Sequence, residues 1–432
     1  MKTVLIAGGK GTRISSLASD IPKPMIKIDG KPVLEHQIEC LRRQGFTDII
    51  ITVSHLGETI TDYFGDGSKI SPATGKPFGV NIEYYTEQKP LGNAGALFRI
   101  KDRLTEDFLL INADLMFDID LKRLTAYHRS HGGAATIFTH PNSHPYDSSL
   151  IVADDNGSVA EWLTKEDERP TYYKNRVNAG IHVLSRKILD FMPDSDIVDL
   201  DRDILKPLAG TKRLYCYDSP EYVRDMGTPE RYNAVCRDFM NGILNKKNLD
   251  NKQKAVFLDR DGTINKHIGF LTDIDDFELL PDAAEAIKKI NESGYLAIIA
   301  TNQPVIARGE ITQEELKLIH DKMETLLGQK GAYIDGIYFC PHHPDKGFNG
   351  EIAELKTDCL CRKPNPGMLL QAADYFNIEL EQSWMIGDSE NDIKAGIAAG
   401  CKTALIGNGN FGQNITADTL LTAVEKIEES IQ

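Results

Sequence analysis

Short apolar runs recur along the chain, and several alternate with stretches whose apolar residues are spaced as on one face of a helix. The helical spacing is clear in residues 32–45, PVLEHQIECLRRQG. Short apolar runs bounded by polar or glycine-rich segments predict buried strands. The predicted strands lie in residues 3–8, 48–55, 80–85, 107–114, 135–140 and 178–184, and then in residues 255–263, 295–303, 336–341, 383–392 and 403–407.

Residues 241–254, NGILNKKNLDNKQK, separate these two series of strands. The segment is rich in Asn and Lys and poor in large apolar side chains, which indicates a linker. A chain of 432 residues is also too long for one typical core. We therefore expect two α/β domains on mostly parallel sheets, residues 1–240 and 255–432. In such sheets ligands bind beyond the carboxyl ends of the strands.

Composition narrows the class of partner. Apolar residues make up 41% of the chain and charged residues 26%, as in globular proteins with sizeable cores. The formal charge of -15 argues against nucleic acid or an anionic membrane as the main partner. We expect small-molecule substrates and leave homo-oligomerisation open. The sequence has no signal-peptide pattern and no apolar run near the ~20 residues of a spanning helix, so we expect a cytoplasmic protein.

Two aspartates, Asp259 and Asp261, end the apolar run AVFLDRDGT. Their spacing lets both carboxylates project to one side as the chain leaves the sheet. Thr301, Lys363 and Asp388 lie at or shortly after later strand-like runs, so four segments converge at one edge. Taken singly, DRDGT also fits a surface turn and GDS a helix cap.

Together these residues suit phosphoryl transfer through a covalent aspartyl-phosphate, with Asp259 as nucleophile and Asp261 as general acid and base. Crowded carboxylates need a cation, and oxygen ligands beside a phosphate indicate Mg²⁺. Its expected ligands are Asp259, the backbone carbonyl of Asp261, and Asp388. Lys363 and the Thr301 hydroxyl would hold the phosphoryl oxygens.

Cysteine and histidine gather in residues 338–367. Seven cysteines in a chain without an export signal argue against a disulfide framework and favour a metal site. His343 is a weaker ligand candidate, because adjacent side chains on an extended segment point apart. Three thiolates and one imidazole suit a closed, structural Zn²⁺ site that would position the loop carrying Lys363. The expected ligands are Cys340, His342, Cys359 and Cys361.

The order of these motifs resembles the haloacid dehalogenase superfamily of phosphatases over about residues 254–410. With CPHHP, CRKPNPGM and DRDGTIN together, this half is similar to the D,D-heptose 1,7-bisphosphate 7-phosphatases. The histidinol-phosphate phosphatases, which share Cys-x-His…Cys-x-Cys on a shorter loop, are the alternative. Pro304 departs from the small hydroxyl residue expected at its position. The resemblance implies substrate recognition by His267, Gly269, Phe270, Asn302, Gln303 and Arg362.

The N-terminal half opens with a glycine-rich loop, LIAGGKGTR in residues 5–13, directly after the first strand. The backbone N–H groups of Gly8, Gly9 and Gly11 can approach phosphates without obstruction by side chains. Arg13 adds positive charge. A simple turn fits the loop equally well when it is taken alone, and the Gly-Lys-Ser/Thr ending of a P-loop is absent.

The motifs PKPM, EQKPLGNAGAL, NADLMFDID, VNAGIHVL and RDMGTPERY follow in order. The set resembles sugar-1-phosphate nucleotidyltransferases over about residues 1–240, most closely the branch for mannose-type and heptose 1-phosphates. Such an enzyme joins two anions and needs cations more than a nucleophile. We therefore expect Arg13 and Lys23 to neutralise the triphosphate, and Asp114 and Asp225 to share Mg²⁺. The resemblance implies that Gln88 and Gly92 contact the base, and that Asn178 and Lys165 contact the sugar and its phosphate.

The two implied reactions are consecutive. Removing the 7-phosphate of heptose 1,7-bisphosphate leaves heptose 1-phosphate, which a sugar-1-phosphate nucleotidyltransferase consumes. The resemblance favours guanylyl transfer from GTP, giving GDP-heptose and pyrophosphate, and leaves the other bases open. A further alternative is that one half is a non-catalytic regulatory module.

Overall fold

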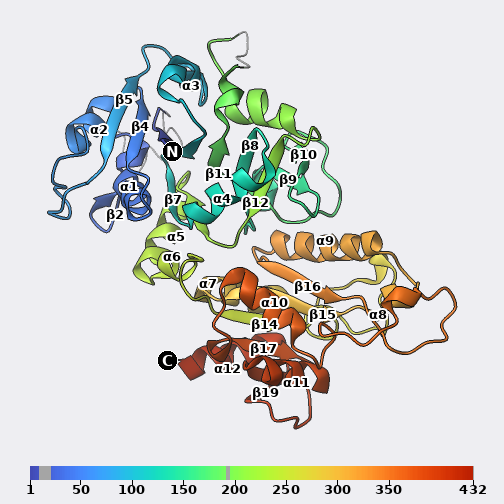
Figure 1. The fold of residues 1–432 in the computed structure, drawn as a ribbon. Coiled ribbons are helices and arrows are strands. Elements are labelled where there is room, and N and C mark those ends of the chain that lie inside the picture. Colours follow the sequence, from blue (N-terminus) through green and yellow to red (C-terminus); the bar gives the residue numbers. More distant parts are fainter. Residues whose placement is uncertain (9–20, 191–194, 432) are drawn as a thin grey trace. The chain divides into compact units, whose positions relative to one another are not determined.

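The computed structural model describes residues 1–8, 21–190 and 195–431 (Figure 1). Contacts divide the chain into two compact units. The first unit consists of Met1–His140, Ser149–Thr164 and Val177–Asn248, and the second of Pro141–Ser148, Lys165–Arg176 and Leu249–Gln432. Residues 241–254, expected as a linker, contain helix α6 (Ile243–Lys246), and the side chains of Ile243 and Leu244 are buried.

A mixed sheet of nine strands forms the centre of the first unit as far as it is described. The order is β10-β9-β11-β6-β1-β4-β5, and β8 pairs with both β11 and β12. β1, β4, β5 and β6 run parallel, whereas β11 runs antiparallel to β6, β8 and β9, so the expected mostly parallel sheet is confined to part of this unit. The strands are β1 (Thr3–Ile6), β4 (Asp48–Val53), β5 (Asn81–Thr86), β6 (Phe108–Asn112), β8 (Ala135–His140), β9 (Leu150–Ala153), β10 (Val159–Leu163), β11 (Val177–Leu184) and β12 (Leu214–Asp218).

Helices and smaller sheets complete the first unit. A two-stranded sheet pairs β7 (Leu115–Asp118) with β13 (Tyr222–Asp225), and another pairs β2 (Lys27–Ile28) with β3 (Lys31–Pro32). The α-helices are α1 (Val33–Arg43), α2 (Gly57–Phe64), α3 (Gly95–Arg99), α4 (Leu121–His131), α5 (Pro229–Met240) and α6.

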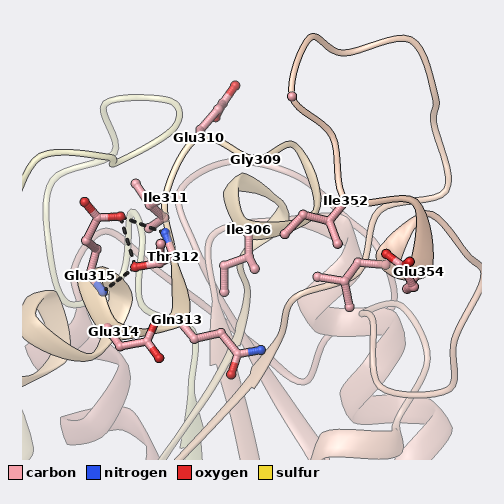
Figure 2. A pocket seen from close by; sticks show the side chains of 12 residues that line it. Ile306, Gly309, Glu310, Ile311, Thr312, Gln313, Glu314, Glu315, Ile352 and Glu354 are labelled. Atoms are coloured by element: carbon pink, nitrogen blue, oxygen red, sulfur yellow. Dashed lines mark hydrogen bonds between the residues drawn. The ribbon is translucent and has the colours of Figure 1, made fainter.

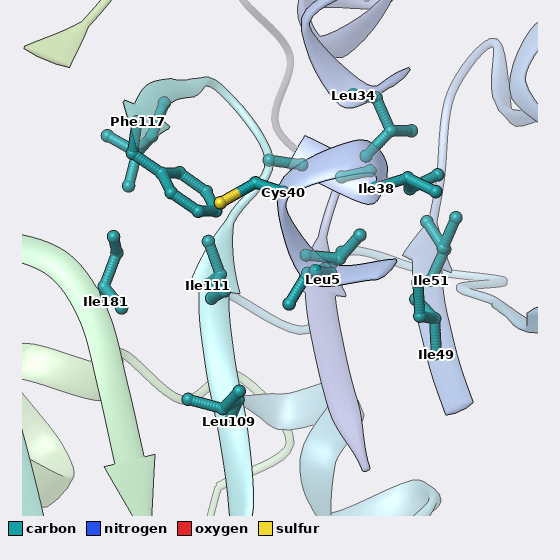
Figure 3. Close-up of a cluster of buried hydrophobic side chains, with 14 of the residues drawn as sticks. Leu5, Leu34, Ile38, Cys40, Ile49, Ile51, Leu109, Ile111, Phe117 and Ile181 are labelled. Carbon is teal, nitrogen blue, oxygen red and sulfur yellow. The ribbon is translucent and has the colours of Figure 1, made fainter. Parts of the chain in front are cut away.

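Apolar side chains cover both faces of the first sheet. Leu5 and Ile51 lie on one face, where they pack with Ile38 of α1 (Figure 3). Their chain neighbours Val4 and Ile50 belong to a separate buried cluster. Because successive side chains on a strand point to opposite faces, a strand that is apolar at each position must be covered on both faces. This explains why these strands are continuous apolar runs in the sequence.

The second unit has a six-stranded sheet in the order β16-β15-β14-β17-β18-β19, in which each named pair is parallel. The strands are β14 (Ala255–Leu258), β15 (Leu296–Asn302), β16 (Gly336–Cys340), β17 (Trp384–Gly387), β18 (Lys402–Ile406) and β19 (Ile415–Ala417). The helices are α7 (Ala283–Ser293), α8 (Pro304–Ala307), α9 (Gln313–Gln329), α10 (Gly367–Phe376), α11 (Glu390–Ala399) and α12 (Leu420–Ile431).

Helices pack on both faces of this sheet as well. Apolar residues of α7, α9 and α12 form one buried cluster with the sheet, and residues of α10 form another. The expected α/β class with two units is confirmed. Among the helices of the described residues, none has the length and apolar composition needed to cross a membrane.

Candidate functional site

The carboxyl ends of three parallel strands bring the predicted phosphatase residues together. β14 lies between β15 and β17, so the three strands end at one edge of the sheet. Asp259 follows β14, Thr301 lies near the end of β15, and Asp388 follows β17. The convergence expected from the sequence is therefore present in the fold.

Lys363 lies at the centre of this edge. Its Nζ is 2.7 Å from Oδ1 of Asp259 and 2.5 Å from Oδ1 of Asp392. All three side chains are buried. Burial, together with the nearby Asp392 charge, raises the pKa of Asp259 to about 7 against the opposing effect of Lys363. Burial also disfavours the ammonium, but the two carboxylates outweigh it and raise the pKa of Lys363.

Three carboxylates at the edge could hold a cation. Oxygen atoms of Asp259, Asp388 and Asp392 all lie within 4.8 Å of one another. Oxygen donors of this kind fit Mg²⁺. The magnesium ligands expected from the sequence included Asp259 and Asp388 but not Asp392, which lies in the same GDSEND motif as Asp388. Asp392 also closes a capping box with Ser389 at the start of α11. This capping role explains an aspartate at position 392 without a metal.

Gly262 leaves the space that the Asp388 carboxylate occupies. A Cβ at Gly262 would lie 2.0 Å from Oδ2 of Asp388, and the φ of this glycine is +87°. Both the contact and the left-handed backbone exclude a larger residue. The glycine of DRDGT therefore allows two separate strand ends to approach each other.

Asp261 is held by three side chains. Nη2 of Arg260 lies 2.9 Å from its Oδ2, Asn265 donates to Oδ1 over 2.9 Å, and Gln303 donates to Oδ2 over 2.9 Å. Burial alone would raise the pKa of Asp261, but the Arg260 charge and these hydrogen bonds lower it. Arg260 is fully buried and contacts His320 over 3.2 Å. The sequence analysis missed it, although its position between two aspartates was a signal.

The segment after β15 connects the site to the Lys363 loop. Asn302 accepts a hydrogen bond from the backbone N–H of Lys363 and donates one to its carbonyl, each over 3.0 Å. Gln303 donates to the Thr301 hydroxyl over 2.9 Å. Pro304, which departs from the family pattern, starts α8. Asn302 therefore holds the loop that delivers Lys363 to the site.

The four predicted zinc ligands converge. Sγ of Cys340 is 3.4 Å from Sγ of Cys359, and Sγ of Cys361 is 3.2 Å from each of the other two sulfurs. Nδ1 of His342 is 3.4 Å from Sγ of Cys361. These separations are far beyond a disulfide bond, and three sulfurs with one imidazole nitrogen match a tetrahedral zinc site. Nδ1 of His343 instead accepts the backbone N–H of Asp345.

The predicted substrate loop is open to solvent. His267, Gly269 and Phe270 are exposed, and Gly269 has a φ of +87° with open space around its Cβ position. The Arg362 guanidinium donates to the carbonyl of His342 over 3.2 Å. The loop that carries Arg362 is thus fixed to the cysteine cluster.

In the first unit, a second edge collects polar groups at the carboxyl ends of parallel strands. Gly8 comes shortly after β1, Glu87 directly after β5, and Asp114 after β6. A Cβ at Gly8 would lie 3.3 Å from Oε1 of Glu87, so this carboxylate faces the start of the glycine-rich loop. Lys23 forms an ion pair with Asp114. The predicted residues Gly9, Gly11 and Arg13 lie outside the described residues.

Strand pairing places Asp225 beside Asp114. β13 is antiparallel to β7, and Asp225 is opposite Leu115, the residue after Asp114. Asp225 also forms an ion pair with Arg231 at 2.9 Å and accepts the N–H of Gly227 over 2.7 Å. Each of the two predicted metal ligands is therefore paired with a cationic side chain.

Asn178 lies at the start of β11, which runs antiparallel to β6 and so begins at the edge where β6 ends. Its Oδ1 accepts the N–H of Gly180 and faces Nε2 of His182, both at 3.2 Å. Lys165 belongs to the second unit. Its side chain is 66% exposed, and it forms an ion pair with Glu166 at 3.8 Å. The contact of Lys165 with a sugar phosphate stays a prediction.

Gly92, in the loop after β5, lies too close to another segment for a larger residue. A Cβ at Gly92, where φ is +77°, would lie 2.2 Å from the carbonyl oxygen of Val198. Gln88 is exposed, whereas the neighbouring Glu87 is half-buried. Burial raises the pKa of Glu87, and the backbone N–H of Leu91 donates to its carboxylate. The sequence analysis missed Glu87, although its position at a strand end was a signal.

A pocket of about 620 Å³ lies elsewhere in the second unit (Figure 2). None of the predicted site residues lines it. Its walls come from α8, the start of α9 and the loop after β16, with Ile306, Gly309 and Ile352 among the residues that line it. The pocket therefore does not coincide with the carboxylate edge.

Comparison with protein families gives two matches. The nucleotidyl transferase model matches residues 2–241, and the HAD-hydrolase-like model matches residues 360–426. The first match covers more than half of the chain.

Relatives of known name match the C-terminal part. A D-glycero-β-D-manno-heptose-1,7-bisphosphate 7-phosphatase from Yersinia pestis is 42% identical over 164 residues, covering 38% of this chain and 84% of the relative. The protein of the same name from Escherichia coli K12 is 37% identical over 184 residues, covering 41% of this chain and 93% of the relative.

Among solved structures, that of HddC from Yersinia pseudotuberculosis is 28% identical with a TM-score of 0.46, and the match covers 55% of this chain and 99% of that one.

Proposed function

The chain belongs to the nucleotidyl transferase family through residues 2–241 and to the heptose-1,7-bisphosphate 7-phosphatase family through its C-terminal part, and on this premise we propose one bifunctional enzyme. The C-terminal site removes the 7-phosphate of D-glycero-D-manno-heptose 1,7-bisphosphate. The N-terminal site then transfers a nucleotidyl group to heptose 1-phosphate and releases pyrophosphate. The observation that carries the proposal is the buried Lys363 ammonium between Asp259 and Asp392, beside Asp388.

In the phosphatase reaction, Asp259 attacks phosphorus and forms an aspartyl-phosphate, while Asp261 donates a proton to the leaving sugar oxygen. The lowered pKa of Asp261 favours its ionised form, which later accepts a proton from the attacking water. An incoming phosphate dianion raises the pKa of a nearby carboxyl group, which favours the protonated form needed in the first step. Lys363 and Thr301 neutralise and hold the phosphoryl oxygens.

Mg²⁺, when bound by Asp259, Asp388 and the Asp261 carbonyl, supplies positive charge for the transferring phosphoryl group. Asp392 is a further candidate ligand because its carboxylate belongs to the same cluster. Lys363 partly neutralises this cluster and opposes the rise in the pKa of Asp259.

Zn²⁺ in the Cys340, His342, Cys359 and Cys361 cluster is structural, because four protein ligands leave no open position for chemistry. The backbone of Arg362 and Lys363 directly follows Cys361. The cysteine cluster therefore positions the residues that hold the phosphate and orient the sugar.

In the nucleotidyl transfer reaction, Lys23 and Arg13 neutralise the triphosphate, and Asp114 and Asp225 hold Mg²⁺. Gly8, Gly9 and Gly11 offer backbone N–H groups to phosphate oxygens, Gln88 and Gly92 contact the base, and Asn178 contacts the sugar phosphate. GTP is the proposed nucleotide. The half-buried Glu87 carboxylate supports it, since a carboxylate can accept two hydrogen bonds from the N1–H and N2–H groups of guanine, whereas adenine presents an acceptor at N1.

The test is a single-pot reaction of the purified protein with heptose 1,7-bisphosphate, GTP and Mg²⁺. Orthophosphate should appear first and pyrophosphate second, with GDP-heptose accumulating. Without GTP the reaction should stop at heptose 1-phosphate. Release of two phosphates per substrate, or faster hydrolysis of histidinol phosphate, would contradict the assignment. Better turnover with ATP, CTP or UTP would overturn only the choice of base.

A further inference from the structure

Arg308 contacts two aromatic rings that belong to different loops. Its guanidinium carbon lies 4.1 Å from the ring centroid of Phe270 and 4.2 Å from that of Phe348. Phe270 is part of the exposed segment 267–270, and Phe348 is part of the loop after β16. The Arg308 side chain is 18% exposed and pairs with Glu310 at 2.7 Å. One cation thus joins two segments that are far apart in sequence.

The loop after β16 is anchored to the turn that carries Arg308. The N–H of Ile352 donates to the carbonyl of Ala307 over 3.0 Å, and the N–H of Ala307 donates to the carbonyl of Pro341 over 3.2 Å. A Cβ at Gly309 would lie 1.9 Å from the carbonyl oxygen of Gly350, so the two backbones are in close contact. Gly309 and Ile352 both line the pocket of Figure 2. This loop is therefore fixed relative to Arg308 by its main chain.

Phe348 is also held from within its own loop. Nζ of Lys356 lies 4.4 Å from the Phe348 ring centroid, and the Lys356 side chain is 1% exposed. Glu351 lies 3.6 Å from this ammonium and accepts the backbone N–H of Phe348 over 3.0 Å. The ring that Arg308 contacts therefore has a defined position.

The segment of Phe270 has less support. Phe270 is 50% exposed, and Gly269 precedes it with open space around its Cβ position. The segment begins shortly after Asn265, whose amide donates to Asp261 in the active site. A contact that fixes Phe270 therefore holds a segment that starts close to the active site.

We propose that Arg308 is a positioning residue for substrate recognition: it joins the 267–270 segment to the loop after β16, so that both present a single surface to the sugar of the bisphosphate. The inference rests on the proposed phosphatase function. Arg308 does not touch the reacting phosphate. Cation–π contacts with two rings favour a planar guanidinium over an ammonium.

The kinetic test compares Arg308→Met, which removes the charge but keeps the length, with Arg308→Lys, which keeps the charge but loses the planar group. For heptose 1,7-bisphosphate we expect KM to rise about tenfold in Arg308→Met, less in Arg308→Lys, with kcat nearly unchanged. With p-nitrophenyl phosphate, which lacks the sugar, kcat/KM should stay at the wild-type value. Equal losses on both substrates would overturn the proposal.

Lys402→Met is the matched control. Nζ of Lys402 lies 5.4 Å from the ring centroid of Trp384, and neither residue belongs to these loops. This variant should leave the kinetics on both substrates unchanged. A rise in KM for the bisphosphate in this variant would show that the effect is not specific to Arg308.

Hydrogen exchange on the full chain separates the inference from the proposed function. Phe348→Leu and Arg308→Met should each accelerate amide exchange in residues 267–271, although Phe348 lies on a different loop. Unchanged exchange there in both variants would refute the connection. If the wild-type protein failed to hydrolyse the bisphosphate, the proposed function would be wrong, and the exchange result would still decide the role of Arg308.

Discussion

Nζ of Lys363 lies 2.7 Å from Oδ1 of Asp259, and both side chains are buried. In Lys363→Met, Asp259 and Asp392 lose their shared cation. We expect phosphate release to fall at least about a hundredfold, because the phosphoryl oxygens lose a preorganised charge. We also expect a loss of about 3 kcal/mol in unfolding free energy, because two buried carboxylates lose the cation that they share. Phosphate assays and urea unfolding measure the two effects.

Lys394→Met is the control for this change. Lys394 pairs with Glu390 one helical turn away, and both side chains are more than half exposed. Its removal should alter stability by less than about 0.5 kcal/mol and leave phosphate release intact. A similar loss in both variants would remove the special role of Lys363.

Separate variants should disable the two reactions independently. Asp259→Asn should abolish phosphate release, because an amide cannot act as the nucleophile, while nucleotidyl transfer from supplied heptose 1-phosphate stays near the wild-type rate. Asp114→Ala should have the opposite effect. Both reactions are measured on each folded variant. Loss of both reactions in either variant would contradict two independent sites.

Metal analysis tests the cysteine cluster. The purified protein should contain about one tightly bound zinc per chain, because three thiolates and one imidazole form a closed tetrahedral set. Cys359→Ser should lower the zinc content, the melting temperature and phosphatase activity together. Cys236→Ser, in the first unit, serves as the control, and this variant should contain as much zinc as the wild type. Zinc-free wild-type protein with freely titratable cysteines would refute the site.

His320 should make the second unit sensitive to acid. Its ring nitrogen lies 3.2 Å from Nη1 of Arg260, and burial together with this charge lowers the pKa of His320 to about 3. The unfolded chain, with an ordinary histidine pKa near 6.5, binds more protons than the folded chain between these values. Stability therefore falls as pH falls below about 6.5, by roughly 3 kcal/mol at pH 4.5.

The comparison is made by urea unfolding at pH 7.5 and pH 4.5. His320→Gln retains an acceptor for Arg260 but cannot titrate, so its loss of stability between the two pH values should be smaller than in the wild type. An identical pH dependence in the two proteins would assign the acid sensitivity to other groups.

Glu87→Gln tests the choice of base. An amide NH₂ group donates a hydrogen bond where the carboxylate accepts one. We therefore expect kcat/KM for GTP to fall about tenfold to a hundredfold, and the ratio of kcat/KM for GTP to that for ATP to become smaller. Glu83→Gln is the control, because Glu83 lies on β5, the strand that Glu87 follows, and pairs with Lys2. An unchanged ratio of GTP to ATP turnover in Glu87→Gln would exclude this carboxylate from base recognition.

The sequence predicted features that depend on local pattern. Asp259 and Asp388 could be placed at one edge because the apolar runs before them predict parallel strands. Arg260 and Glu87 were missed because their importance depends on burial by segments far away in the sequence, which a local pattern does not contain. Gly92 was named from the sequence as a contact of the base. The structure adds a separate reason for glycine at this position, because a Cβ there would meet the Val198 carbonyl.

The presence of both units in one chain fixes the ratio of the two activities at synthesis. Each unit has its own charged edge, built from its own strands. A cell cannot adjust the supply of heptose 1-phosphate by making more of one enzyme than of the other. Matching production to consumption must then be achieved in the kinetic constants of the two sites, which makes their ratio a quantity under selection.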